Sequence, residues 1–169
     1  MGLSNWPWAD VKAHDEEAPG IYVSDAVGVG TVIRRNHFHG TFDGIDFCGD
    51  SAAQTTTESD VYDNLVDDHL DDDSEADGSC INSRLFRNRF ADVHMGISLA
   101  PASPGPLFVV RNTIYRYGHL ANDSVNTPFK MNNGYSQVTS NVFIYHTTAI
   151  SEAAAGGDAT NADNMPAMW

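Results

Sequence analysis

The sequence predicts an all-β fold, a single-stranded right-handed parallel β-helix of about five coils. Three observations support this prediction: a short pattern recurs along the chain, an asparagine stands at its centre, and β-branched and aromatic residues surround that asparagine. The chain has 169 residues, of which 41% are hydrophobic and 19% charged. This composition is enough for the core of one domain and argues against disorder.

The repeat has an apolar residue three positions before each central asparagine and another two positions after it. The copies cover 32–38, 60–66, 84–90, 108–114 and 137–143, centred on Asn36, Asn64, Asn88, Asn112 and Asn141. Side chains of a straight strand alternate, so two apolar residues five positions apart cannot both point inward. We therefore expect the backbone to bend at the asparagine, which tolerates the left-handed conformation. The stacked amides would then hydrogen-bond along the solenoid.

A second apolar stretch follows each copy, and together these stretches predict another continuous sheet. They lie at 43–47, 69–75, 95–99, 128–131 and 148–150, and the second is strongly acidic. Extended ligands lie along such faces of solenoids, so we expect the ligand face here. The predicted β-helix covers residues 20–150.

The ends of the chain differ from the repeats. Residues 1–19 contain Trp6, Pro7 and Trp8 and are expected to form an N-terminal cap or extension. Residues 151–169 are rich in Ala, Gly, Asn and Asp, which predicts a flexible C-terminal tail. Five coils span only about 24 Å, and strands at both ends would be unpaired. We expect either a short solenoid that forms a homo-oligomer through an exposed end or an excised piece of a longer one.

The net charge of the chain excludes some classes of binding partner. The formal net charge of −14 would repel nucleic-acid phosphates and anionic lipids. No apolar run approaches the roughly 20 residues of a membrane span, and the N-terminus lacks the pattern of a signal peptide. We therefore expect neither a nucleic-acid nor a membrane partner. Cys48 and Cys80 could pair if stacked, but isolated buried thiols are common, so their pairing stays open.

The asparagine-centred repeats resemble the pectate-lyase-like superfamily of right-handed parallel β-helices from about Gly20 to Ile150. Three stretches look like bacterial β-helix-repeat proteins of undefined activity: Asp71-Asp72-x-x-Glu75-x-Asp77-Gly78, Gly96-Ile97-Ser98 with Pro101, and Gly105-Pro106 ahead of Arg111-Asn112. Relatives of this fold mostly meet polymers outside the cell. The resemblance therefore implies a polysaccharide partner and an extracellular or periplasmic location.

A weaker likeness is to polygalacturonase-type glycoside hydrolases. Four stretches keep the order of that family: 41–46, Asp72-Asp73, 94–98 and Phe129-Lys130. The likeness implies that Asp72 is the general acid, with Asp43 and Asp73 activating water. It also implies that His94 holds the network and that Lys130 binds an acidic sugar.

The residues themselves are also compatible with glycoside hydrolysis. This reaction needs two carboxylates that flank the scissile bond, and it needs no cofactor. Crowding acids on one face raises the pKa of some of them, as a general acid requires. We expect Asp46, His69 and Tyr115 to contact the sugar, although packing is the commoner role of tyrosine.

Two alternatives stay open. The acidic run could bind Ca²⁺ through Asp71, Glu75 and Asp77, because calcium prefers hard oxygen ligands. In the related lyases and epimerases, a cation bridges uronates to the enzyme while a Lys or Arg removes a proton. That base would be Lys130 or one of Arg84, Arg87, Arg89 and Arg111. Alternatively, the acidic run is a solvated turn, and the protein is a non-catalytic polysaccharide-binding or structural module.

Overall fold

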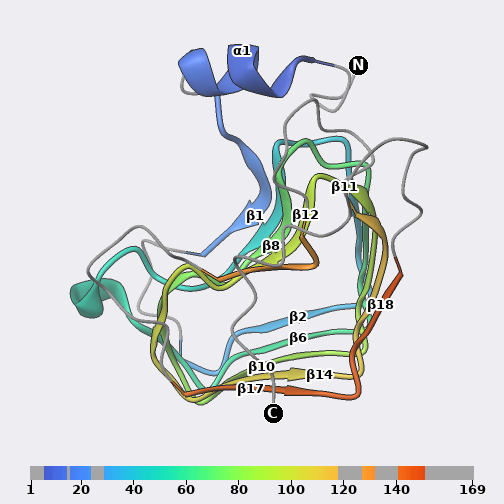
Figure 1. The fold of residues 1–169 in the computed structure, drawn as a ribbon. Coiled ribbons are helices and arrows are strands. Elements are labelled where there is room, and N and C mark those ends of the chain that lie inside the picture. The colour runs from blue at the N-terminus through green and yellow to red at the C-terminus, as the bar shows by residue number, and fades with distance from the viewer. Residues whose placement is uncertain (1–5, 15, 24–28, 118–126, 132–140, 151–169) are drawn as a thin grey trace.

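Short strands separated by tight bends wind the chain into a parallel β-solenoid of about four turns (Figure 1). The computed structural model describes residues 6–14, 16–23, 29–117, 127–131 and 141–150. The predicted parallel β-helix is confirmed. It has about four turns rather than five because the five stacked strands of a sheet enclose only four complete turns between them.

Three five-stranded parallel sheets form the main walls. The acidic sheet, named for its outer residues, contains β1 (Pro19–Tyr22), β4 (Asp43–Asp46), β8 (Asp72–Glu75), β12 (Met95–Ser98) and β16 (Phe129–Lys130). The arginine sheet contains β2 (Val32–Arg34), β6 (Asp60–Tyr62), β10 (Ser83–Phe86), β14 (Leu107–Val110) and β17 (Val142–Tyr145). The third sheet contains β3 (His37–His39), β7 (Leu65–Asp67), β11 (Arg89–Val93), β15 (Thr113–Tyr117) and β18 (Thr148–Ile150).

A three-stranded sheet lies on the remaining side, and a 3-10 helix precedes its first strand. The sheet contains β5 (Thr56–Thr57), β9 (Gly78–Ile81) and β13 (Ala102–Pro104), and the helix is η2 (Ala52–Gln54). The acidic sheet and the arginine sheet lie on opposite sides of the core (Figure 1). The core is filled by one buried column from each main sheet: Ile45, Ile97 and Phe129; Val61, Leu85 and Val109; Val66, Phe90 and Ile114.

The predicted asparagine ladder is present at the bend between the arginine sheet and the third sheet. Asn64 Nδ2 donates to Ile33 O and to Asn88 Oδ1, both at 3.0 Å. Asn88 Nδ2 repeats the pattern with Val61 O at 2.9 Å and Asn112 Oδ1 at 3.0 Å. The buried amides therefore satisfy one another along the stack, which stabilises the bend.

The left-handed backbone conformation falls on the residue before each asparagine rather than on the asparagine itself. Arg35, Asp63, Arg87 and Arg111 have φ angles of 57°, 56°, 55° and 55°. The preceding residue makes the bend, while the asparagine supplies the hydrogen bonds. The predicted bend is therefore displaced by one position.

The position predicted for the fifth ladder residue is wrong. The sheet register pairs Val110 with Tyr145 and Thr113 with Thr148, so Thr147 occupies the ladder position expected for Asn141. Asn141 instead precedes β17, where its main-chain carbonyl accepts a hydrogen bond from Leu107 N at 3.0 Å. The stretch from Asn112 to Thr147 is longer than one repeat, so spacing alone misassigned the register.

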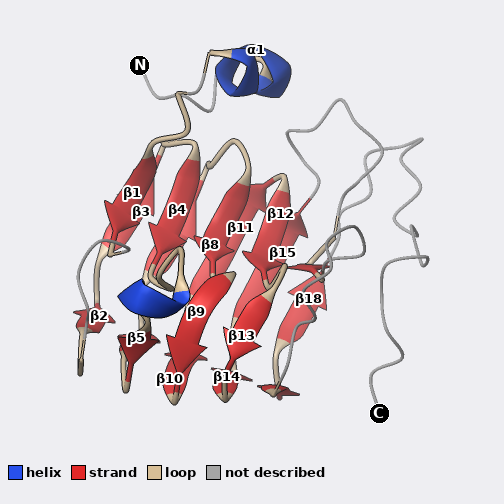
Figure 2. Ribbon diagram, turned by 90° about the vertical axis from the view of Figure 1, so that its left-hand side faces the viewer, coloured by secondary structure: helices blue, strands red, loops and turns tan. Residues whose placement is uncertain are grey.

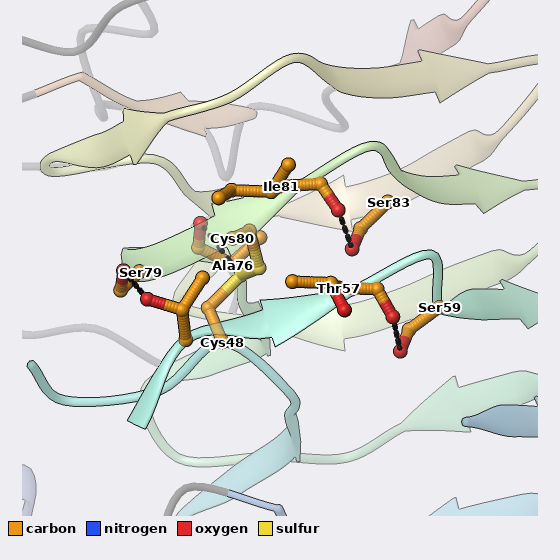
Figure 3. Close-up of a disulfide and its surroundings, with 9 residues drawn as sticks. Cys48, Thr57, Ser59, Ala76, Ser79, Cys80, Ile81 and Ser83 are labelled. Carbon is orange, nitrogen blue, oxygen red and sulfur yellow. Dashed lines mark hydrogen bonds between the residues drawn. A yellow bond between two sulfur atoms is a disulfide. The ribbon is translucent and has the colours of Figure 1, made fainter. Parts of the chain in front are cut away.

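Cys48 and Cys80 form a disulfide inside the solenoid, which answers the question that the sequence left open (Figure 3). Cys48 follows β4 and Cys80 lies in β9, and their Cα atoms are 5.2 Å apart. Nearby, the hydroxyls of Ser59 and Ser83 donate to carbonyls two residues earlier, at 3.1 and 3.2 Å (Figure 3). Stacking of adjacent coils brings the two cysteines together although 32 positions separate them.

Helix α1 (Trp8–Ala13) lies along a corner of the solenoid beside the acidic sheet (Figure 2). Buried Val11 packs against Phe42 and Leu70, and the Trp8 ring meets the ring of His94 edge-on at 6.0 Å. The helix thus contacts three successive coils. The boundaries of the predicted cap and β-helix stay predictions, and the predicted tail at 151–169 lies outside the described residues.

Candidate functional site

The register of the acidic sheet aligns acidic residues that are distant in the sequence. Asp46 pairs with Glu75, Glu75 with Ser98, and Ser98 with Lys130. By the same register, Asp43 lies beside Asp72, and the Asp72 main-chain N–H donates to Asp43 Oδ1 at 3.1 Å. These residues come from successive coils, as the repeat spacing predicts.

Three carboxylates converge where β4 and β8 begin. One oxygen from each of Asp43, Asp71 and Asp72 lies within 4.8 Å of the others, and no side chain of the three is more than 3% exposed. We call these three residues the carboxylate cluster. Burial and the neighbouring charges of Asp72 and Asp71 raise the pKa of Asp43 well above its ordinary value. Asp43 is therefore the member of the cluster that keeps a proton most readily.

Lys130 contacts the cluster on the side of Asp72. Its Nζ donates to Asp72 Oδ2 at 2.7 Å. Burial raises the pKa of Asp72 to about 7, although the charge of Lys130 opposes the increase. The attraction of Asp72 and Asp71 outweighs burial at Lys130 and raises the pKa of its ammonium group above the ordinary value. Lys130 is thus a permanent cation, suited to holding a carboxylate and poorly suited to removing a proton.

Asp71 has two partners of its own. His94 Nδ1 lies 3.3 Å from Asp71 Oδ1, and Lys12 Nζ of helix α1 lies 3.5 Å from Asp71 Oδ2. Burial favours the neutral form, but hydrogen bonding with His94 and the charges of Lys130 and Lys12 lower the pKa of Asp71 below its ordinary value. The cluster therefore combines an ionised Asp71 with a protonated Asp43.

A pocket of about 310 Å³ opens beside the cluster and is lined by Glu17, Pro19, Tyr22, Asp43, Asp46, Asp50 and Glu75. Asp43 belongs to both the pocket and the cluster. Burial, followed by the charges of Asp77 and Asp50, raises the pKa of Asp46 to about 7. Burial and the surrounding acids raise the pKa of Glu75 to about 10. The pocket thus contains acids that hold protons at neutral pH.

Sequence reasoning missed Tyr22, Glu17 and Asp50 in this pocket. Tyr22 pairs with Asp46 in the register, and its hydroxyl donates to Asp50 Oδ2 at 2.8 Å. A signal for Tyr22 was present, since Gly20-Ile21-Tyr22 repeats the Gly-Ile pair of residues 44–45 and 96–97. Aligning these pairs would have added the first strand to the predicted ligand face.

Asp73 does not join Asp43 and Asp72 on the outer side of the acidic sheet. In the register, Asp73 lies between Gly44 and Gly96. A Cβ added at these glycines would meet Val66 and Ile114 of the third sheet at 2.4 and 2.7 Å. Asp73 is 0% exposed, and burial raises its pKa well above the ordinary value. The expectation that it shares a face with the other acids is corrected: Asp73 faces inward.

The other predicted residues are scattered. His69 is buried, its ring nitrogens lie 2.9 Å from Thr41 Oγ1 and 3.2 Å from Phe38 O, and burial lowers its pKa to about 4. Tyr115 lies on β15 in the third sheet. Neither lines the pocket. Of the predicted calcium ligands, Asp71 belongs to the cluster and Glu75 to the pocket, and Asp77 accepts a hydrogen bond from Ser98 Oγ at 3.0 Å. The charge of Asp77 contributes to the raised pKa of Glu75, and calcium binding stays a prediction.

The fold and the cluster define a parallel β-solenoid with buried acids on one wall. A scan against protein-family models matched none of them, and searches of curated proteins and of solved structures also returned no match. Within the described ranges, no helix has the length and apolar character needed to cross a membrane. The comparisons therefore add no family and no activity to what the geometry provides.

The raised pKa values predict that the protein loses stability as the pH rises. Asp46 and Asp72 have ordinary values of 3.8 and folded values of about 7, and Glu75 changes from 4.5 to about 10. Above about pH 4, the unfolded chain releases these protons while the folded protein retains them, so the free energy of unfolding falls. The decrease continues to about pH 7 for the two aspartates and to about pH 10 for Glu75.

We expect the melting temperature to be lower at pH 8.5 than at pH 5 by about 5 °C or more, as measured by differential scanning fluorimetry. The variant Asp46→Asn should reduce this difference, because the neutral amide replaces one of the titrating groups. A melting temperature that stays constant or increases between these pH values would contradict the prediction.

Proposed function

We propose that the protein is a carbohydrate-active member of the pectate-lyase-like superfamily that hydrolyses glycosidic bonds in an acidic or plant-type polysaccharide. The observation that carries this proposal is the position of Asp43, which lines the pocket and also contacts Asp72 in the carboxylate cluster. Two adjacent carboxyl groups with different protonation states are what glycoside hydrolysis requires.

Asp43 is the proton donor in this proposal, because it faces the pocket and its pKa is raised well above the ordinary value. Asp72 is the partner that ionises in this proposal: burial raises its pKa to about 7, and above that pH Lys130 favours its carboxylate form. Asp72 Oδ1 is buried and has no hydrogen-bond partner among the described residues. The roles of Asp43 and Asp72 are thus reversed from those implied by the likeness to polygalacturonase-type enzymes.

The spacing of the pair supports one stereochemical course. Oxygens of Asp43 and Asp72 lie within 4.8 Å of each other. This is closer than the gap of at least about 6.5 Å that admits the water used by inverting enzymes, so the pair fits the retaining class better. We therefore propose that Asp72 attacks the anomeric carbon while Asp43 protonates the departing glycosidic oxygen. Water deprotonated by Asp43 then displaces the sugar from Asp72, and the anomeric configuration is retained.

The surroundings of the site support a location outside the cytosol. Disulfides such as Cys48–Cys80 persist mainly in oxidising compartments. The proposed location is therefore extracellular or periplasmic, where polysaccharide polymers occur.

The test is a panel of polysaccharides, including polygalacturonate and neutral plant polymers, incubated with the full chain in Ca²⁺ or in EDTA. A hydrolase releases saturated reducing ends in both conditions. Reducing ends that appear on no substrate of the panel would reject the proposal. Retention on a polysaccharide column without any product would instead identify a non-catalytic binding module.

A second candidate is calcium-dependent lyase or epimerase chemistry on uronates. The observation in its favour is the carboxylate cluster, whose hard oxygens are of the type that Ca²⁺ prefers. It needs a base, however, and the raised pKa of Lys130 makes that residue a weak one. Arg84, Arg87 and Arg111 belong to the arginine sheet or its bend, on another wall. An unsaturated, ultraviolet-absorbing product formed only with Ca²⁺ would favour this candidate.

A further inference from the structure

The outer side of the arginine sheet carries two rows of side chains that run along the solenoid. One row contains Arg34, Tyr62, Phe86, Val110 and Tyr145, and the other contains Val32, Asp60, Arg84, Phe108 and Phe143. Aromatic rings stack within each row: Tyr62 on Phe86 with centroids 4.7 Å apart, and Phe108 on Phe143 at 5.5 Å. This wall is opposite the acidic sheet (Figure 1).

Val110 interrupts the first aromatic row. Val110 lies between Phe86 and Tyr145 in the register. These two aromatic positions are therefore two strand spacings, about 9.6 Å, apart. Stacked rings need a centroid separation of at least about 4.5 Å, so this interval has room for one additional ring. A pocket of about 520 Å³ lies at this place, lined by Asp60, Asn82, Arg84, Phe86, Arg87, Phe108, Val110 and Arg111.

The arginines at this pocket differ in how they are paired. Arg84 binds Asp60 through two nitrogens, one of them at 2.9 Å, and Arg87 binds Asp63 at 2.8 and 2.9 Å. Arg111 is exposed, and among the described residues no carboxylate lies within ion-pair distance of its guanidinium. Arg111 therefore presents an unneutralised cation at the edge of the pocket.

We propose that this pocket binds one uronate unit of a polysaccharide, with the sugar ring over Val110 against Phe86 and the sugar carboxylate on Arg111. A guanidinium group binds a carboxylate through two parallel hydrogen bonds, and the apolar face of a sugar ring packs on an aromatic side chain. The choice of a sugar rests on the proposed function. The pocket holds the polymer at a distance from the carboxylate cluster and has no part in bond cleavage.

The charges of this wall favour a uronate over a nucleic acid. Binding to a phosphate backbone depends on several free cations that track the chain. Here Asp60 and Asp63 already neutralise Arg84 and Arg87, and the whole chain carries a net charge of −14. Among the three arginines that line the pocket, Arg111 alone has no carboxylate partner among the described residues, and one such guanidinium suits a single carboxylate on a sugar ring.

The experiment is calorimetric titration of the full chain with a hexamer of galacturonic acid, in EDTA. Val110→Phe should abolish measurable binding, because the new ring fills the interval and continues the stack. Arg111→Gln should weaken binding by at least tenfold. Arg35→Gln is the matched control, since this arginine has the same bend conformation outside the pocket, and it should bind like the unaltered protein. Melting temperatures confirm that each variant folds.

Several outcomes would overturn the inference. Hexamer binding that is unchanged in folded Val110→Phe and Arg111→Gln proteins would place the ligand elsewhere. Equal affinity for a neutral glucose hexamer would show that Arg111 does not bind a sugar carboxylate. Binding of single-stranded DNA with equal or greater affinity, lost in the same variants, would assign the pocket to a polyanion other than a uronate.

The inference and the proposed function fail in distinguishable ways. If the panel yields no product but Val110→Phe abolishes hexamer binding, the uronate pocket is supported and the hydrolase proposal is rejected. If the protein releases reducing ends while Val110→Phe leaves hexamer binding intact, the hydrolase proposal is supported and the uronate pocket is rejected. Hydrolysis of a short soluble substrate should be unchanged in both pocket variants, because neither residue touches the carboxylate cluster.

Discussion

Replacing Asp72 with asparagine is expected to lower the rate of polysaccharide hydrolysis by roughly 10³-fold or more. The amide has the shape of the carboxylate and still offers an oxygen to Lys130, which donates to Asp72 at 2.7 Å in the unaltered protein. It has no negative charge, however, and cannot act as the ionised partner. Initial rates of reducing-end release on the best substrate of the panel measure the effect.

The pH dependence of the residual activity gives a second readout. The charge of Asp72 is one of the causes that raise the pKa of Asp43. Its removal should lower that pKa, so the decline of activity on the alkaline side should move to lower pH. Asp67→Asn is the matched control, because Asp67 pairs with His37 on the third sheet at 3.0 Å. A rate within a few-fold of the unaltered protein in Asp72→Asn would contradict the assignment.

Replacing Asn88 with alanine is expected to decrease the free energy of unfolding by about 3 kcal/mol or more. Asn88 donates to Val61 O and Asn112 Oδ1, and its own Oδ1 accepts from the main chain and the side chain of Asn64. Alanine removes all four hydrogen bonds. The buried Asn64 main-chain N–H loses its acceptor, whereas Asn112 Oδ1 still accepts from the Asn88 main-chain N–H. Chemical denaturation followed by circular dichroism measures the loss.

Asn36→Ala is the control for this prediction. Asn36 lies at the exposed end of the ladder, where its side chain donates to Arg34 O and Asn64 Oδ1 at 3.1 Å. Water can replace these contacts, so we expect a loss of only about 1 kcal/mol. Equal losses in the two variants would show that the buried stack contributes nothing beyond a surface hydrogen bond.

Much of the solenoid could be predicted because its determinants recur locally. Each coil that carries Asn64, Asn88 or Asn112 repeats the apolar positions around the asparagine at nearly constant spacing, and parallel stacking then follows. Prediction failed at Asn141, where the interval between ladder positions is longer than one repeat. A local pattern cannot indicate how much chain leaves the coil before the next strand begins.

The candidate site could be predicted in part for the same reason. Coil spacing brought Asp43 and Asp72 together, and also Asp46 and Glu75. It could not show that Asp73 faces inward, because the direction of a side chain next to a bend depends on the local backbone path rather than on strict alternation. Tyr115 was misplaced because it belongs to a different wall.

Repeated apolar and asparagine positions were thus sufficient to specify a stacked parallel coil and to collect acids on one wall, since both follow from short-range order. The Cys48–Cys80 disulfide, the partners of Lys130 and the interval over Val110 emerge only in the folded chain. Each depends on the exact register between coils. That register is set by the length of every turn, so no single segment of the sequence determines it.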